Sequence, residues 1–116
     1  MSGKSDDAQA LTGLIRWEAP LGELIEAANR CDRRTVPAAL LCRSAVRDVL
    51  RRCVSGDLAL AELPHWAFSV HMMESVEIVE GDLDLLSRFL VEVSSPELFG
   101  PVTKDVCEQW SQRMAA

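Results

Sequence analysis

The stretch VPAALLCRSAVRDVLRRCV, residues 36–54, decides the fold class. Its apolar residues recur at steps of three and four, and its arginines form the opposite ridge, which is the pattern of an amphipathic core helix. Thr35 suits the N-cap, Pro37 lies near the start and Gly56 follows the end. The stretch therefore predicts a helix over residues 36–54 that packs one face against other helices.

The same helical periodicity recurs on both sides of this stretch. Pro20 suits a first helical turn, and Pro64 is compatible with a helix that begins near residues 60–62. Asp82 can cap a further helix with an apolar stripe, and Gly100-Pro101 precedes a last one. We therefore predict an all-α fold, a compact bundle of four to five amphipathic helices.

The chain length favours one domain. Residues 1–8 are polar and are expected to form a disordered leader, which leaves residues 9–116 as a single helical bundle. Residues 10–17 fit a helical turn or a strand equally well. Alternation of period two is confined to residues 76–79, inside a predicted loop.

Export and membrane insertion are not expected. No apolar run approaches the roughly 18 residues of a membrane span, and the first residues lack the apolar core of a signal peptide. We expect a cytoplasmic protein without membrane contact. Its four cysteines are then expected to be reduced, small core residues.

The motifs of catalysis and metal binding are weak. Gly3-Lys4-Ser5 lacks the upstream glycine and strand of a phosphate-binding loop. His65 and His71 are six residues apart, whereas two imidazoles on one helix bind a metal at a spacing of four. We expect no enzyme, no catalytic residue, no metal and no cofactor.

The acidic residues are concentrated in one half of the chain. Residues 1–58 carry nine Lys/Arg and eight Asp/Glu, whereas residues 59–116 carry three and ten. The densest run, residues 74–84, contains five acids and no Lys or Arg, and β-branched apolar residues lie between the acids. Such a surface favours a basic partner. The candidate contacts are Glu74, Glu77, Ile78, Glu80, Asp82 and Asp84, with Trp66 as a further apolar anchor.

A basic face is the alternative site. Residues 30–52 hold seven arginines and no lysine, and Arg43, Arg47 and Arg51 share one ridge of the predicted helix. Guanidinium groups bind phosphates and carboxylates in pairs of hydrogen bonds, so this ridge would suit nucleic acid or an acidic partner. The overall charge of −6 opposes nucleic-acid binding. The alternative functions are therefore an adaptor or regulatory subunit that uses this ridge, or a structural homodimer.

Residues 55–67, Ser-Gly-Asp-Leu-Ala-Leu-Ala-Glu-Leu-Pro-His-Trp-Ala, resemble a helix end and Trp-Ala helix start of small bacterial immunity proteins. The acidic middle and the closing helices extend this resemblance to the colicin-D-type and related immunity proteins of polymorphic toxin systems over residues 40–116. The resemblance implies a compact helical bundle that binds a basic toxin, often a nuclease, and masks its active site with acidic residues. The leading expectation is therefore a non-enzymatic inhibitor.

Overall fold

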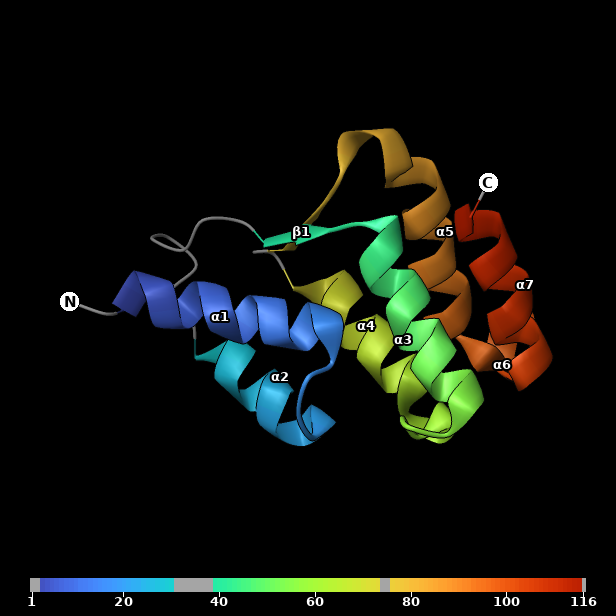
Figure 1. Cartoon of the computed structure of the whole chain (residues 1–116), viewed down its shortest axis with the longest axis horizontal. Coiled ribbons are helices and arrows are strands. Elements are labelled where there is room, and N and C mark those ends of the chain that lie inside the picture. Colours follow the sequence, from blue (N-terminus) through green and yellow to red (C-terminus); the bar gives the residue numbers. More distant parts are fainter. Residues whose placement is uncertain (1–2, 31–38, 74–75, 116) are drawn as a thin grey trace.

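The computed structural model describes residues 3–30, 39–73 and 76–115, and side chains from residue 9 onward. Within these ranges the chain forms seven α-helices, two single 3₁₀ turns and one small sheet of two strands (Figure 1). The fold is thus compact and mostly helical, as predicted, but it has more helices than four to five and includes strands. The bounds are α1 Gly3–Arg16, α2 Leu21–Asn29, β1 Ala39–Leu41, α3 Arg43–Ser55, η1 Leu60–Glu62, α4 Leu63–Met72, β2 Val76–Ile78, η2 Glu80–Asp82, α5 Leu83–Ser94, α6 Pro96–Phe99 and α7 Lys104–Ala115.

The predicted helix over residues 36–54 is shorter than expected, because its first part is a strand. β1 pairs in parallel with β2, and the Cα partners include Leu40 with Glu77 and Leu41 with Ile78. Helix α3 begins only at Arg43, while Thr35 and Pro37 lie outside the described residues. A short apolar run fits a strand or a helix. Here the run forms a strand because it pairs with β2, which lies 37 residues further along the chain.

Helix α1 occupies the beginning of the chain, where a leader over residues 1–8 was predicted. It starts at Gly3, so residues 3–8 belong to it, whereas residues 1–2 lie outside the described part. It also resolves the ambiguity over residues 10–17 in favour of a helix, which ends in a left-handed residue, Trp17, with a φ of 53°. Its buried side chains are Leu11, Leu14 and Ile15.

A chain of aromatic rings runs through the single apolar core. Trp17 stacks on Trp66 with ring centroids 6.0 Å apart, and Trp66 meets Phe89 edge to face at 6.4 Å. Phe89 meets Trp110 in the same manner at 5.4 Å. These four rings join the end of α1 to α4, α5 and α7, and such pairs add to the free energy of area burial. The three tryptophans are therefore all core residues.

The helices form two groups along an elongated molecule of 45 × 29 × 24 Å. Figure 1 shows α1 and α2 at one end and α3, α5 and α7 at the other, with the segment from β2 to α5 arching over the top. Helix α3 packs on α7, and α4 packs on α5. No helix within the described ranges has the length and apolar character needed to cross a membrane.

Candidate partner-binding surface

Three acids of the predicted run project into solvent from consecutive elements. Glu77 lies on β2, Glu80 on η2 and Asp84 in the first turn of α5, and all three are exposed. None forms an ion pair with a described residue. Glu74 lies outside the described residues. These exposed carboxylates give the arch a negative surface.

Asp82 has a different environment from these three acids. Its Oδ1 accepts a hydrogen bond from Nε of Arg43 at 2.7 Å, and its side chain is only 18% exposed. The ion pair joins the arch to the first residue of α3. Asp82 therefore holds the acidic segment against the bundle, and its charge is partly neutralised within the chain.

Trp66 cannot anchor a partner, contrary to the prediction. Its side chain is 0% exposed, and its indole Nε1 donates a hydrogen bond of 2.7 Å to the carbonyl oxygen of Leu14. A buried tryptophan usually satisfies its N–H in this way. Ile78 is half-buried and packs against the core, so it offers a partner only part of its side chain.

Two exposed leucines neighbour the exposed acids. Leu40 is 60% exposed and is the register partner of Glu77, so the two side chains emerge on the same face of the sheet. Leu83 is 52% exposed and directly precedes Asp84. Each exposed leucine thus lies next to one of the exposed acids. We name this set the acidic loop surface: Leu40, Glu77, Glu80, Leu83 and Asp84.

The sequence did not indicate that either leucine is exposed here. Leu40 falls inside the helix predicted over residues 36–54, and nothing in that pattern predicts its pairing with residue 77. Leu83 fits the apolar stripe of the helix that is predicted after Asp82, because it is three residues before Leu86. The pairing of β1 with β2, which brings Leu40 here, leaves no local signal in either strand.

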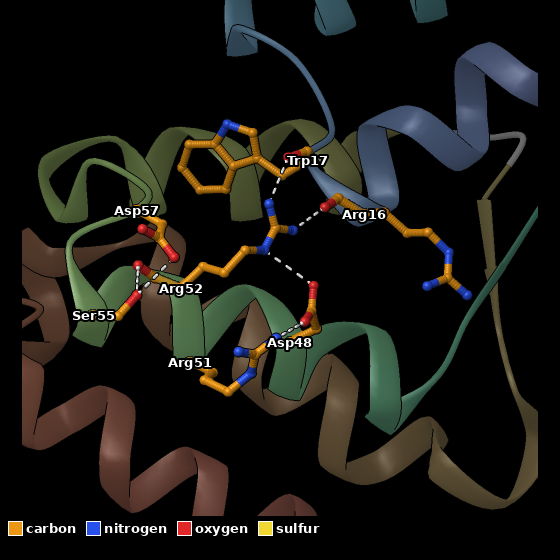
Figure 2. A network of polar contacts seen from close by, with 7 residues as sticks. All are labelled: Arg16, Trp17, Asp48, Arg51, Arg52, Ser55 and Asp57. Atoms are coloured by element: carbon orange, nitrogen blue, oxygen red, sulfur yellow. Dashed lines mark hydrogen bonds and ion pairs between the residues drawn. The ribbon is translucent and has the colours of Figure 1, made fainter.

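The basic face is largely neutralised by Asp48. Nη2 of Arg51 donates to Oδ1 of Asp48, and Nε of Arg52 donates to Oδ2 at 3.0 Å (Figure 2). The hydrogen bond from Arg51, together with the charge of Arg52, holds the pKa of Asp48 below its usual value. Arg43 is bound by Asp82. Of the predicted ridge, Arg47 alone has no partner among the described residues.

A groove between α3 and α7 passes beside this ridge. It has a volume of about 530 Å³, and its walls carry charges of both signs, from Arg47 and Arg51 and from Asp48 and Glu108. Half-buried Val54 contributes to its lining. Because the charges are mixed, the groove is not a surface of one sign that would attract a polyanion.

The thiols differ sharply in their surroundings. Burial raises the pKa of Cys53 to about 12 and that of Cys107 to about 11. A hydrogen bond with the hydroxyl of Ser44, at 3.2 Å, lowers the pKa of half-buried Cys42.

His65 and His71 are exposed on α4. Among the described residues, no three His, Cys, Asp or Glu side chains are grouped to hold a metal ion.

The resemblance to immunity proteins concerns the segment that leads from α3 into α4 and the acidic arch that follows. In the structure, residues 55–67 form the end of α3, the turn η1 and the first part of α4. Comparisons of the chain with protein-family models, curated proteins and solved structures found no match.

Proposed function

We propose that the protein is a non-enzymatic inhibitor of the immunity type, which binds a basic site of a partner protein through the acidic loop surface. Glu77, Glu80 and Asp84 would enter the electropositive site, and Leu40 and Leu83 would make the apolar contacts. A toxin whose substrate is a polyanion, such as a nuclease, carries a basic site of this kind.

The observation that carries the proposal is an asymmetry in ion pairing. Arg30, Arg43, Arg51 and Arg52 each lie within 4 Å of a carboxylate of this chain. In contrast, the three exposed acids of the acidic loop surface pair with no described cation. Most of the described positive charge within residues 30–52 is therefore compensated internally, whereas these three carboxylates remain available to a partner. This favours the acidic surface over the basic face.

The charge and the leucines would act at different steps of binding. Residues 59–116 carry a net charge of −7, which accelerates the encounter with a basic protein and makes the association rate depend on salt. Exposed rim charges contribute little to the final affinity. The leucines, once desolvated, would slow dissociation. Such a complex would weaken in high salt without being lost.

A pull-down with the tagged full chain tests the proposal. The wild-type chain is incubated with lysate of its native host and washed at low and then high salt, and the retained proteins are identified by mass spectrometry. We expect one basic protein that the wild type retains and that the triple variant Glu77→Gln, Glu80→Gln, Asp84→Asn retains in a clearly smaller amount. Its purified form should then lose its activity when the wild-type chain is added.

Two matched variants serve as controls. The triple variant Glu18→Gln, Glu23→Gln, Glu26→Gln removes the same charge from exposed positions beside α1 and on α2, and should retain the basic protein. The double variant Arg47→Glu, Arg51→Glu should also retain it, whereas a nucleic-acid or acidic partner would be lost. Equal retention of the basic protein by both triple variants would contradict the proposal.

A further inference from the structure

The outer side of helices α4 and α5 carries exposed apolar side chains that the core does not use. Phe68 and Met72 on α4 are 51% and 60% exposed, and Leu83 and Val91 on α5 are 52% and 40% exposed. These are four of the seven large apolar side chains that are exposed within the described part of the chain. Clustered exposed apolar residues of this kind mark interaction sites more often than scattered ones do.

Helix geometry places Phe68 on the side of α4 that faces away from α1. Trp66 points to α1, since its Nε1 reaches the carbonyl of Leu14, and Phe68 lies about 200° further around α4, on the side away from α1. On α5, Leu85 and Arg88 line a hollow with Arg113 of α7.

Helix α5 packs against α4. At about 100° per residue, Leu83 projects away from Leu85, and Val91 lies about 80° around α5 from Leu83. Asp84, which also lines the hollow, lies beside Val91 on this outer side. Met72 follows Phe68 at a spacing of four, so both lie on one ridge of α4. We name this face the outer apolar face: Phe68, Met72, Leu83 and Val91.

The net charge of the segments that carry the outer apolar face favours a basic occupant. Across residues 63–73 and 76–99, Arg88 is the one Lys or Arg, whereas six acids are present, Glu77, Glu80, Asp82, Asp84, Glu92 and Glu97. Asp84 lies next to Leu83 in the first turn of α5. Two copies of this chain placed face to face would bring these like charges together, which disfavours a homodimer at this face. A partner with basic flanks has the complementary charge.

We propose that the outer apolar face binds an amphipathic helix of the partner protein, with an apolar stripe flanked by Lys or Arg. Two packed helices with apolar ridges form a surface on which a third helix can lie, with anchors spaced three and four residues apart. At about 1.5 Å per residue, α4 and α5 offer room for roughly three helical turns. The inference rests on the proposed function, because it assumes that one basic partner contacts both the acidic loop surface and the outer apolar face.

A synthetic peptide tests this site without the natural partner. The probe is a peptide of about 18 residues, Leu and Lys in a helical amphipathic pattern, titrated into the isotope-labelled full chain and followed by NMR. We expect shifted amide signals along α4 and α5 around the four residues of the outer apolar face. A peptide with the same composition and a shuffled pattern should bind at least tenfold more weakly.

Variants of the chain identify the contact residues. Phe68→Ser with Met72→Ser should weaken binding of the peptide at least tenfold, and circular dichroism checks that the helices persist. Leu98→Ser, at a residue that is 77% exposed on α6, should leave it unchanged. Equal affinity for the wild type and the Phe68/Met72 variant would overturn the inference. A dimer of the wild type that the Phe68/Met72 variant abolishes would also overturn it, because the occupant would be a second copy.

The two proposals fail in different ways. If the lysate yields no basic partner but the peptide binds to the outer apolar face, the proposed function fails while the site for a basic helix stands. If retention of a basic partner requires Glu77, Glu80 and Asp84 but the affinity for the peptide does not change in the Phe68/Met72 variant, the proposed function stands. The inference about the outer apolar face then fails.

Discussion

The guanidinium of Arg52, in α3, donates a hydrogen bond of 3.0 Å to the main-chain carbonyl of Trp17, just after the end of α1 (Figure 2). Its Nη2 also donates to the carbonyl of Arg16. The end of α1 is a Schellman motif, in which the N–H of Glu18 bonds to Gly13 and that of Trp17 to Leu14. Trp17 occupies the left-handed position that glycine normally takes, at an energetic cost. Arg52 and the stacking of Trp17 on Trp66 offset this cost.

The variant Arg52→Met tests this role of Arg52. It keeps much of the aliphatic stem but leaves the carbonyls of Arg16 and Trp17 without their charged donor, so the free energy of unfolding should fall by about 1–3 kcal/mol. Arg51→Met is the control, since its side chain is 72% exposed and bonds to Asp48, and it should change the value by less than about 1 kcal/mol. Urea denaturation of both variants checks this. Equal losses would show that Arg52 contributes no more than a surface pair.

Trp66→Phe removes the indole donor from the core and keeps an aromatic ring. The loss of the hydrogen bond to Leu14 and of part of the ring volume should lower the free energy of unfolding by about 2–4 kcal/mol. Trp110→Phe removes the same volume from a ring with no described hydrogen bond through its indole N–H, and should cost less. Thermal and urea unfolding of the two variants compares them. A larger loss of unfolding free energy for Trp110→Phe would contradict a stabilising role of the hydrogen bond from Trp66 to Leu14.

Asp48 should make stability depend on pH on the acid side. Because the pKa of Asp48 is lowered in the folded state, its contribution is present above the unfolded pKa, about 3.9, and is lost as the pH falls through the folded value. Asp48→Asn should therefore lower stability near neutral pH, and the difference from wild type should shrink below about pH 4. Unfolding measured at several pH values checks this. A difference that does not change with pH would rule out an ionised Asp48 as the cause.

The thiols of Cys42, Cys53 and Cys107 should react with iodoacetamide at different rates. The thiolate is the reacting species, and Cys42 has a lowered pKa and is partly accessible. Burial and raised pKa values protect Cys53 and Cys107. Mass spectrometry of timed digests near pH 8 should find Cys42 modified first of the three. Ser44→Ala should slow its modification, because it removes the hydrogen bond that lowers the pKa. Earlier labelling of Cys53 would contradict this order.

Periodicity predicted the helices, and most of the core follows from it. Val46, Val49, Leu50 and Cys53 are buried on α3 at the spacing expected for one apolar stripe. The acids Glu77, Glu80 and Asp84 were identified as candidate contacts from composition alone, because charged residues without a partner remain at the surface.

The remaining features depend on contacts between distant segments. Strand β1 forms because residues 76–78 lie beside it, and no pattern within Ala39–Leu41 distinguishes it from the first turn of a helix. The burial of Trp66 depends on the carbonyl of Leu14, which is 52 residues away. The exposure of Leu83 depends on how far the arch carries the start of α5 from the core. Local sequence contains none of these relationships.

The parallel pairing of β1 with β2 also has a consequence for folding. Leu40 meets Glu77 only after α3 and α4, which lie between the two strands, have folded back, so closure of this long loop must follow local helix formation. We therefore expect the acidic loop surface to be absent from a newly made or partly unfolded chain. A partner that recognises Leu40 and Glu77 together would bind the native state alone, and its binding would stabilise the whole chain by mass action.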